Sequence, residues 1–208
     1  VVVVDFLHSL LDSYKTRAVD EVTEVECYAK RLTGSDSYQL TPWDFSYYSN
    51  KLKEYKFNVN SELLRPYFEL SRVLNAVFNL STRLYGISFV RNRDLPVYHE
   101  DVEAYEVYDE DGTFLALLYC DFYSRPSKKP GAWMTMFKEQ WTDDEMCDSR
   151  PHVSIVMNFA KPTSEIPSLL SLEEVETLLH EFGHSLHAMF SKVKYRSLSC
   201  TNVLWDFV

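Results

Sequence analysis

The sequence predicts an α+β fold: helices first, then a small antiparallel sheet, then one further helix beside that sheet. Apolar residues recur at helical spacing through the first third of the chain and again over residues 171–190. Between residues 102 and 159 they alternate or run continuously, as they do in strands. The 208 residues are 46% hydrophobic and 15% aromatic, which is sufficient for a buried core.

Three helices are expected before residue 95. The first covers residues 5–32 and ends at Gly34. The second begins at residues 41–44, where a proline stands near the first turn. The third covers residues 63–85 and ends at Gly86, because glycine is common just past a helix C-terminus.

The middle of the chain predicts four strands. Residues 102–108 and 113–123 flank the turn signal DEDG, which predicts a β-hairpin. Residues 132–137 and 152–159 are expected to form two further strands. The segment 142–151 between them is polar and is expected to be irregular.

Charge and composition exclude several classes of protein. A net charge of −10 argues against a nucleic-acid partner, which requires basic patches. No run of about 18 apolar residues predicts a membrane span, and the VVVV start followed by Asp5 does not read as a signal peptide, so we expect a cytoplasmic protein without a membrane partner. The four cysteines are far apart and predict free thiols. The oligomeric state is left open.

The segment SLEEVETLLHEFGHSLHAMF (171–190) carries the candidate chemistry. Ser171 and Glu174 fit a capping box at the start of a helix. His180 and His184 then lie one turn apart on one face, so both imidazoles can bind one Zn²⁺ ion. Glu181 stands next to them and can act as the general base for a water molecule.

An ordinary helix with two histidines four residues apart is the alternative. The predicted cap, the apolar back of the helix and the preceding strand favour the zinc site. Gly183 costs roughly 1 kcal/mol in a helix interior, which predicts the close approach of another group. His187 can be a ligand, an outer group beside the ligands or a packed histidine, and the last two are favoured.

The sequence resembles the thimet oligopeptidase family of zinc peptidases, and within it the bacterial peptidyl-dipeptidases (dipeptidyl carboxypeptidases). Segments over essentially the whole chain carry the resemblance: TPWDFSYYSNKL (41–52), LRPYFEL (64–70), LPVYHEDVEAYEV (95–107), LYCDFYSRPSKKPGAWM (118–134), IVMNFAKPT (155–163), LLHEFGHSLHAMFS (178–191) and SLSCTNVLWDFV (197–208).

The resemblance implies a mainly helical, zincin-like metallopeptidase. Residues 1–208 would be part of its catalytic domain, with 1–95 mainly helical and 96–208 forming the sheet and the site helix. His180 and His184 would be zinc ligands and Glu181 the general base. The third ligand would be a glutamate directly after Val208, so we expect the C-terminal remainder of the domain to be missing. The family usually has glycine where Cys200 stands here, and Trp205 is a second departure.

The implied reaction is zinc-dependent hydrolysis of peptide bonds in short peptides, with release of C-terminal dipeptides. An endo-acting oligopeptidase of the same family is the alternative, as is an inactive fragment that binds peptide or metal. The strand 152–159 is expected at a sheet edge, where the backbone of His152, Val153 and Ser154 would bind the substrate. A serine hydrolase is disfavoured because no GxSxG motif is present.

Overall fold

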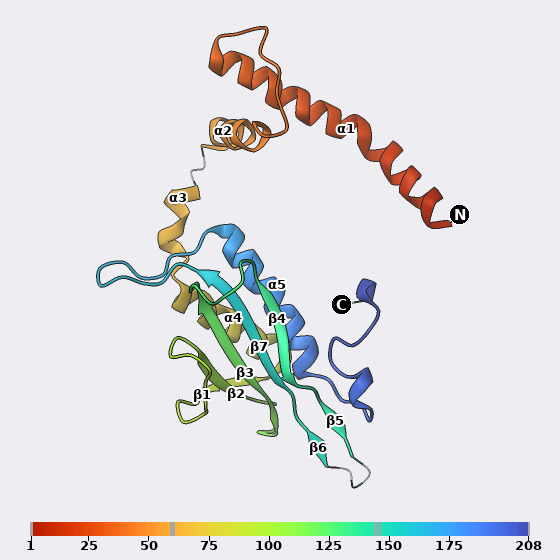
Figure 1. Cartoon of the computed structure of the whole chain (residues 1–208), viewed down its shortest axis with the longest axis vertical. Coiled ribbons are helices and arrows are strands. Elements are labelled where there is room, and N and C mark those ends of the chain that lie inside the picture. The colour runs from red at the N-terminus through yellow and green to blue at the C-terminus, as the bar shows by residue number, and fades with distance from the viewer. Residues whose placement is uncertain (1, 59–60, 144, 146, 208) are drawn as a thin grey trace. The chain divides into compact units, whose positions relative to one another are not determined.

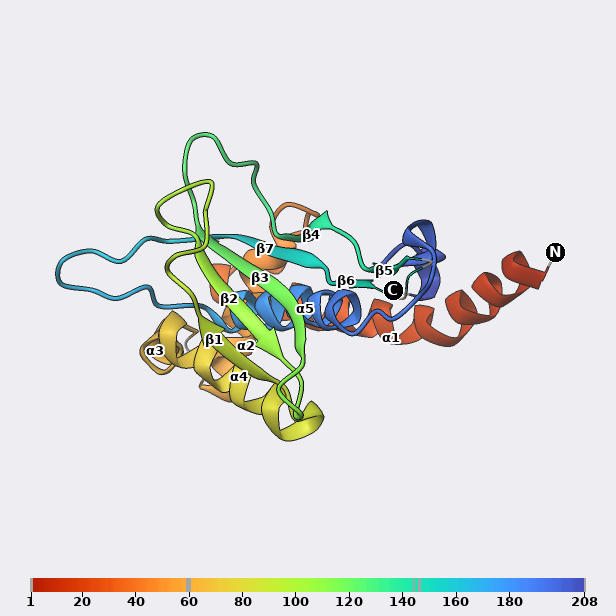
Figure 2. The ribbon, with the colours of Figure 1, turned by 90° about the horizontal axis from the view of Figure 1, so that it is seen from below.

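The computed structural model describes residues 2–58, 61–143, 145 and 147–207 (Figure 1) (Figure 2). The chain divides into two compact units, Val1–Leu63 and Leu64–Val208. The helices are α1 (Val2–Thr33), α2 (Phe45–Phe57), α3 (Ser61–Leu64), α4 (Leu70–Tyr85) and α5 (Leu172–Met189), with 3₁₀ turns η1 (Arg65–Tyr67), η2 (Arg196–Leu198) and η3 (Trp205–Phe207). The strands are β1 (Ser88–Arg91), β2 (Glu103–Tyr108), β3 (Phe114–Tyr123), β4 (Trp133–Lys138), β5 (Trp141–Thr142), β6 (Asp148–Ser149) and β7 (His152–Phe159).

The first unit confirms the first two predicted helices. α1 ends at Gly34, which has a φ of +68°, and α2 begins after Asp44. The Asp44 carboxylate accepts hydrogen bonds from Thr41 at 2.6 Å and Tyr38 at 2.8 Å, which fixes the turn before α2. α1 and α2 contact each other, and the Arg31 guanidinium lies 4.2 Å from the centre of the Tyr55 ring.

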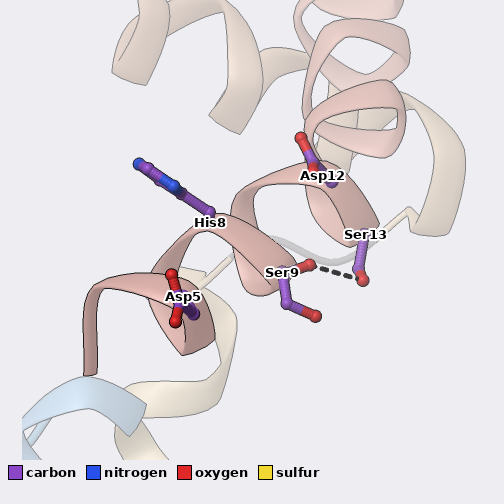
Figure 3. Close-up of a pocket in the computed structure, with 5 residues that line it drawn as sticks. All are labelled: Asp5, His8, Ser9, Asp12 and Ser13. Carbon is purple, nitrogen blue, oxygen red and sulfur yellow. Dashed lines mark hydrogen bonds between the residues drawn. The ribbon is translucent and has the colours of Figure 1, made fainter. Parts of the chain in front are cut away.

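One face of α1 also carries a shallow polar pocket (Figure 3). Its lining residues are Asp5, His8, Ser9, Asp12 and Ser13. Ser13 Oγ donates to the Ser9 carbonyl oxygen at 2.7 Å, which is an ordinary contact within a helix. All five lining residues are exposed, so this pocket is a solvated helix face.

The third predicted helix is interrupted. Instead of one helix over 63–85, the structure has α3, η1 and then α4. The backbone between η1 and α4 pairs with a distant segment: Leu70 N donates to the Ser168 carbonyl at 2.9 Å, and Leu170 N donates to the Phe68 carbonyl at 2.8 Å. These long-range backbone hydrogen bonds replace hydrogen bonds within a helix. The spacing of apolar residues along the sequence does not predict them. α4 ends at Gly86, as predicted, with a φ of +75°.

The second unit contains a five-stranded sheet in the order β1-β2-β3-β7-β4. The β2–β3 hairpin is confirmed, and Gly112 in its turn has a φ of +82°. The expectation of an antiparallel sheet is wrong in one respect, because β3 and β7 pair in parallel and the sheet is therefore mixed. The sequence analysis also missed β1 and the small β5–β6 pair, which are too short to show a period.

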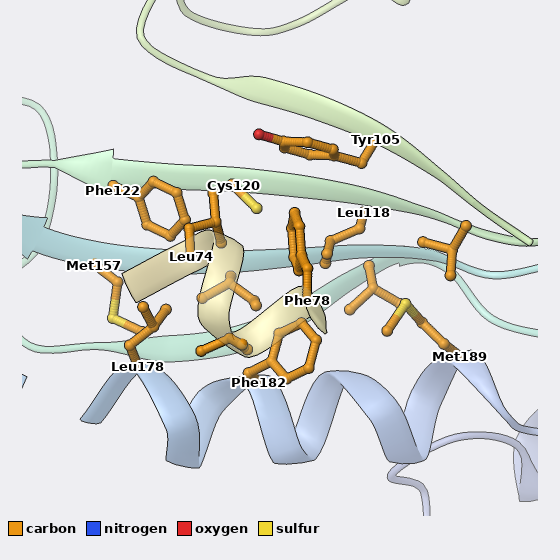
Figure 4. Close-up of a cluster of buried hydrophobic side chains, with 14 of the residues drawn as sticks. Leu74, Phe78, Tyr105, Leu118, Cys120, Phe122, Met157, Leu178, Phe182 and Met189 are labelled. Atoms are coloured by element: carbon orange, nitrogen blue, oxygen red, sulfur yellow. The ribbon is translucent and has the colours of Figure 1, made fainter. Parts of the chain in front are cut away.

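One face of the sheet packs against α4 and α5 (Figure 4). Phe78 of α4 stacks on Phe89 of β1 at 4.0 Å between ring centres, and it lies 6.0 Å from Phe182 of α5. Leu118 and Cys120 of β3 and Met157 of β7 belong to the same buried cluster. Burial of this one face is the dominant stabilising term of the second unit.

The division between the two compact units lies inside the stretch 1–95, which is mainly helical. It falls at residues 63 and 64, because α4 buries its apolar face against the sheet and belongs with it. None of the four cysteines forms a disulfide, as predicted, and Cys120 and Cys200 are buried. Within the described part of the chain, no helix has the length and apolar character needed to cross a membrane.

Candidate metal and peptide site

α5 begins with the predicted capping box. Glu174 N donates to Ser171 Oγ at 3.1 Å, and Ser171 N donates to Glu174 Oε2 at 2.7 Å. Both bonds satisfy backbone donors that a helix N-terminus otherwise leaves without partners. The cap therefore fixes the start of the helix on which the HEFGH motif lies.

The two histidines of the motif lie together on that helix. Their Nε2 atoms are 3.1 Å apart, and their rings are nearly perpendicular at 89°. Tetrahedral zinc with Zn–N bonds of about 2.0–2.1 Å places two nitrogen ligands roughly 3.3 Å apart. His180 and His184 therefore fit as two ligands of one ion. Without a metal, the same distance corresponds to a single hydrogen bond between the rings.

Glu181 lies between the two histidines in sequence and is largely buried, with 9% of its surface exposed. Its carboxylate makes no hydrogen bond or ion pair with any residue that the structure describes. Its oxygens are not among the buried side-chain atoms without a partner, so water reaches them. Its free lone pairs make it available as a proton acceptor.

A third protein ligand is not found. Over residues 2–58, 61–143, 145 and 147–207, no group of three or more His, Cys, Asp or Glu side chains is placed to hold a metal. His187 lies 6.4 Å from Phe207, measured between ring centres, as a packed histidine does. The predicted close approach to Gly183 is also not found among the described residues, because a Cβ built there meets none of their atoms within 4 Å.

The expected edge position of residues 152–159 is wrong. β7 is an interior strand: Ser154 pairs with Tyr119 of β3 on one side and with Thr135 of β4 on the other. The same holds for His152 and Val153, so their backbone groups are used within the sheet. Apolar alternation indicates a buried strand face, but it does not reveal whether a strand has one neighbour or two.

β4 occupies the edge instead. Among the described strands it pairs only with β7, which leaves one side of it without a partner. α5 packs beneath β7 and β4 (Figure 1). The site helix and the free strand edge therefore belong to the same border of the sheet.

The motif faces this border. Val175 and Leu179 line a groove together with residues of α4, so they mark the flank of α5 that faces α4. At about 100° per residue, Glu181 and His184 lie on the opposite flank of the helix. Since α4 packs under β1 at the other end of the sheet, Glu181 and His184 are turned toward the β4 edge.

Arg150 supports the C-terminal end of the site helix and was missed by sequence analysis. Its Nη2 donates to the Met189 carbonyl at 2.6 Å, its Nη1 to the Ser191 carbonyl at 3.0 Å and its Nε to the Leu115 carbonyl at 2.7 Å. A cation is favourable at a helix C-terminus, where carbonyls lack partners. The partners are distant in sequence, so no local signal predicts them.

Cys200 follows the site helix and adopts a left-handed backbone with a φ of +57°. This is the position where the resemblance implies glycine, and glycine adopts such a φ without strain. The residue is held in place because its N–H donates to Ser191 Oγ at 3.0 Å and its side chain is 3% exposed. The Trp205 side chain lies outside the described part of the chain.

Comparison with known proteins identifies the family of the chain. The sequence matches the profile of Peptidase family M3 over residues 1–208. The chain belongs to Peptidase family M3. This confirms the resemblance that the motifs carry.

Relatives of this family include two proteins of Escherichia coli (strain K12). The chain is 41% identical over 205 residues to a dipeptidyl carboxypeptidase. The aligned region covers 98% of this chain and 29% of the relative. It is 35% identical over 207 residues to oligopeptidase A, covering 99% of this chain and 30% of the relative. A probable cytosolic oligopeptidase A of Arabidopsis thaliana is 36% identical over 210 residues, covering 98% and 30%. The chain spans about 30% of the length of these relatives.

Proposed function

We propose that this chain forms the zinc-binding part of a peptidase that hydrolyses peptide bonds in short peptides. The observation that carries the proposal is the 3.1 Å separation of His180 and His184 Nε2 on a helix that also carries the unpartnered Glu181 carboxylate. Membership of Peptidase family M3 and the names of the peptidase relatives support it.

His180 and His184 would hold one Zn²⁺ ion through their Nε2 atoms. A third donor would come from outside the described residues, and a glutamate after Val208 stays a prediction. When bound, zinc supplies Lewis-acid chemistry that polarises a carbonyl and acidifies water. Glu181 accepts a proton from the attacking water and passes it to the amine nitrogen that leaves.

The substrate would lie along β4 rather than β7. The free edge of β4 offers backbone N–H and C=O groups to an extended peptide, which then becomes a further strand of the sheet. Main-chain pairing of this kind is largely independent of substrate side chains. The HEFGH motif faces the same border, so the paired peptide would run beside Glu181.

The principal test measures zinc content and peptide hydrolysis for the full gene product and for the 208-residue chain. We expect one tightly bound zinc ion and turnover in the full product. The chain alone should bind zinc weakly and turn over little, because two histidines are fewer ligands than a zinc site uses. Glu181→Gln should keep zinc but lose about 10²–10⁴-fold in rate, whereas His184→Ala should lose zinc. A full product that binds no zinc, or that keeps its rate with Glu181→Gln, contradicts the proposal.

The bond that is cleaved is proposed to be the one that releases a C-terminal dipeptide. The higher identity to the dipeptidyl carboxypeptidase, 41% against 35% for oligopeptidase A, favours this over internal cleavage. Mass spectrometry of products from peptides with free and amidated C-termini separates the two. Dipeptide release should require the free carboxylate, whereas equal internal cleavage of both peptides supports the oligopeptidase alternative.

A cytoplasmic location stays a prediction. One relative is named as cytosolic and another, from the same plant, as chloroplastic or mitochondrial. Fractionation of the source cells, with detection of the gene product, tests it.

A further inference from the structure

A second concave site lies on the sheet face opposite α5, at the same β4 edge. It is a hollow of ≈ 710 Å³. Its lining residues come from β4, from the segment before β4 and from neighbouring strands and loops: Tyr98, Asp121, Arg125, Ser127, Lys128, Lys129, Pro130, Trp133, Thr135, Phe137 and Val156. The loops before β2 and before β4 rise on the side away from α4 and α5 (Figure 2).

Successive side chains of β4 point to opposite faces of the sheet. Trp133, Thr135 and Phe137 line the hollow, whereas Met134 and Met136 pack against the core that covers α5. Over residues 133–136 this is the alternation expected of a strand, and Phe137 follows at a register shift between Met136 and Lys138. A peptide paired with β4 alternates in the same way, so every second side chain of that peptide would lie over the hollow. The remaining side chains would face the α5 side, where the HEFGH motif lies.

The walls of the hollow are suited to a flat apolar side chain. Phe137 contacts Tyr98 edge to face at 5.7 Å between ring centres, and it is 56% exposed. Tyr98 is itself half exposed and Trp133 is partly buried. Aromatic side chains favour such offset and edge-to-face contacts, and they bury a large area when they make them.

The charges at the base of the hollow are arranged around one carboxylate. Asp121, whose side chain is 1% exposed, accepts two hydrogen bonds from Arg125, at 2.7 and 2.8 Å, and one from Lys128 Nζ at 2.9 Å. Lys128 also donates to the Met157 carbonyl at 2.5 Å, which fixes the loop to β7. These contacts hold the base in one conformation before a ligand arrives.

One cation at the hollow, Lys129, does not bind Asp121. Lys129 is exposed, and its amino group has no hydrogen bond or ion pair with a residue in the described part of the chain. With Arg125, Lys128 and Lys129 against Asp121, three cations and one carboxylate leave the lining with a formal charge of +2. This local excess stands out in a chain whose net charge is −10. It attracts negatively charged groups.

We propose that this hollow binds alternate side chains of a peptide strand paired with β4, and that it selects aromatic side chains and side chains with a negative charge. The inference rests on the proposed function, since it takes the β4 edge as the substrate site. It adds the chemical class of the preferred substrate and the residues that select it.

The first test moves one phenylalanine along an otherwise uniform alanine peptide. Binding is measured by fluorescence anisotropy with the Glu181→Gln form of the full gene product, so that the peptide is not consumed. We expect the affinity to rise at every second position along the regular part of β4, before the register shift between Met136 and Lys138. Phe137→Ala should remove this period of two. Because Phe137 is 56% exposed, the substitution should leave the fold intact, which circular dichroism checks. A flat scan, or a scan without a period of two, overturns the proposal.

The second test reverses one charge. Lys129→Glu should change the preference for glutamate-bearing over lysine-bearing peptides by about 2- to 30-fold, because one exposed attraction becomes a repulsion. Lys192→Glu is the matched control: Lys192 is also exposed but does not line the hollow. Equal effects of the two variants overturn the proposal.

The two levels of inference fail separately. If the wild-type full product hydrolyses peptides but shows neither the period of two nor the charge effect, the pocket assignment is wrong and the proposed function stands. If it hydrolyses no peptide, the proposed function is wrong, whereas anisotropy still decides whether the hollow binds peptide.

Discussion

Gly183 in the HEFGH motif offers a sharp test of the reasoning about the site helix. The structure gives it a helical backbone, and a Cβ built there meets nothing within 4 Å. Glycine inside a helix costs roughly 1 kcal/mol relative to alanine, because the unfolded chain has more freedom to lose. Gly183→Ala should therefore raise the free energy of unfolding by about 0.5–1 kcal/mol.

The matched control is Gly112→Ala in the β2–β3 turn. Its Cβ would also meet nothing within 4 Å, but Gly112 has a φ of +82°, which L residues rarely adopt. This substitution should lower the free energy of unfolding by about 1 kcal/mol. Both glycines have room for a Cβ and lie in the same compact unit, so the backbone conformation is the difference between them that the comparison tests.

The assay is thermal unfolding followed by circular dichroism. For a chain of this length, about 1 kcal/mol moves Tm by roughly 2–4 °C, so the two variants should shift Tm in opposite directions. If Gly183→Ala lowers Tm while Gly112→Ala behaves as expected, an unseen group contacts this helix face. In the full gene product, a gain in stability together with a loss of peptide affinity would show that the substrate makes that contact.

Three further predictions concern positions around the site. Cys200→Gly should be more stable than Cys200→Ala by about 1 kcal/mol in urea unfolding, because both lose the thiol but only glycine relieves the φ of +57°; equal stabilities would contradict this. Ser171→Ala should lower stability by about 1 kcal/mol through loss of the N-cap, whereas Ser171→Thr should keep most of it. Burial raises the pKa of Asp121, but hydrogen bonds from Arg125 and Lys128 outweigh burial and hold the pKa below its usual value. Its stabilising effect is therefore present above the unfolded-state pKa of about 3.9 and is lost as the pH falls through the folded-state value. Asp121→Asn should destabilise the protein at pH 7, and the difference from wild type should shrink below about pH 4; a pH-independent difference would refute the assignment.

Local sequence was sufficient for the elements that depend on local rules. The capping box of Ser171 and Glu174, the glycine at the end of α4 and the β2–β3 turn all depend on residues within a few positions of one another. The pairing of His180 with His184 is of the same kind, because four residues make roughly one helical turn. The family was also carried by the sequence, through motifs over the whole chain.

Only the tertiary structure decided which strands are neighbours. The sequence correctly predicted a strand over residues 152–159. Its parallel pairing with β3 on one side and its antiparallel pairing with β4 on the other join segments that are separated in the chain. The break before α4 likewise depends on backbone bonds to residues 168–170. Periodicity reports which face of an element is buried, whereas pairing depends on partners that the local pattern does not specify. For that reason the sequence was sufficient to predict the helix that carries the HEFGH motif, whereas the fold determined that the free edge beside it belongs to β4.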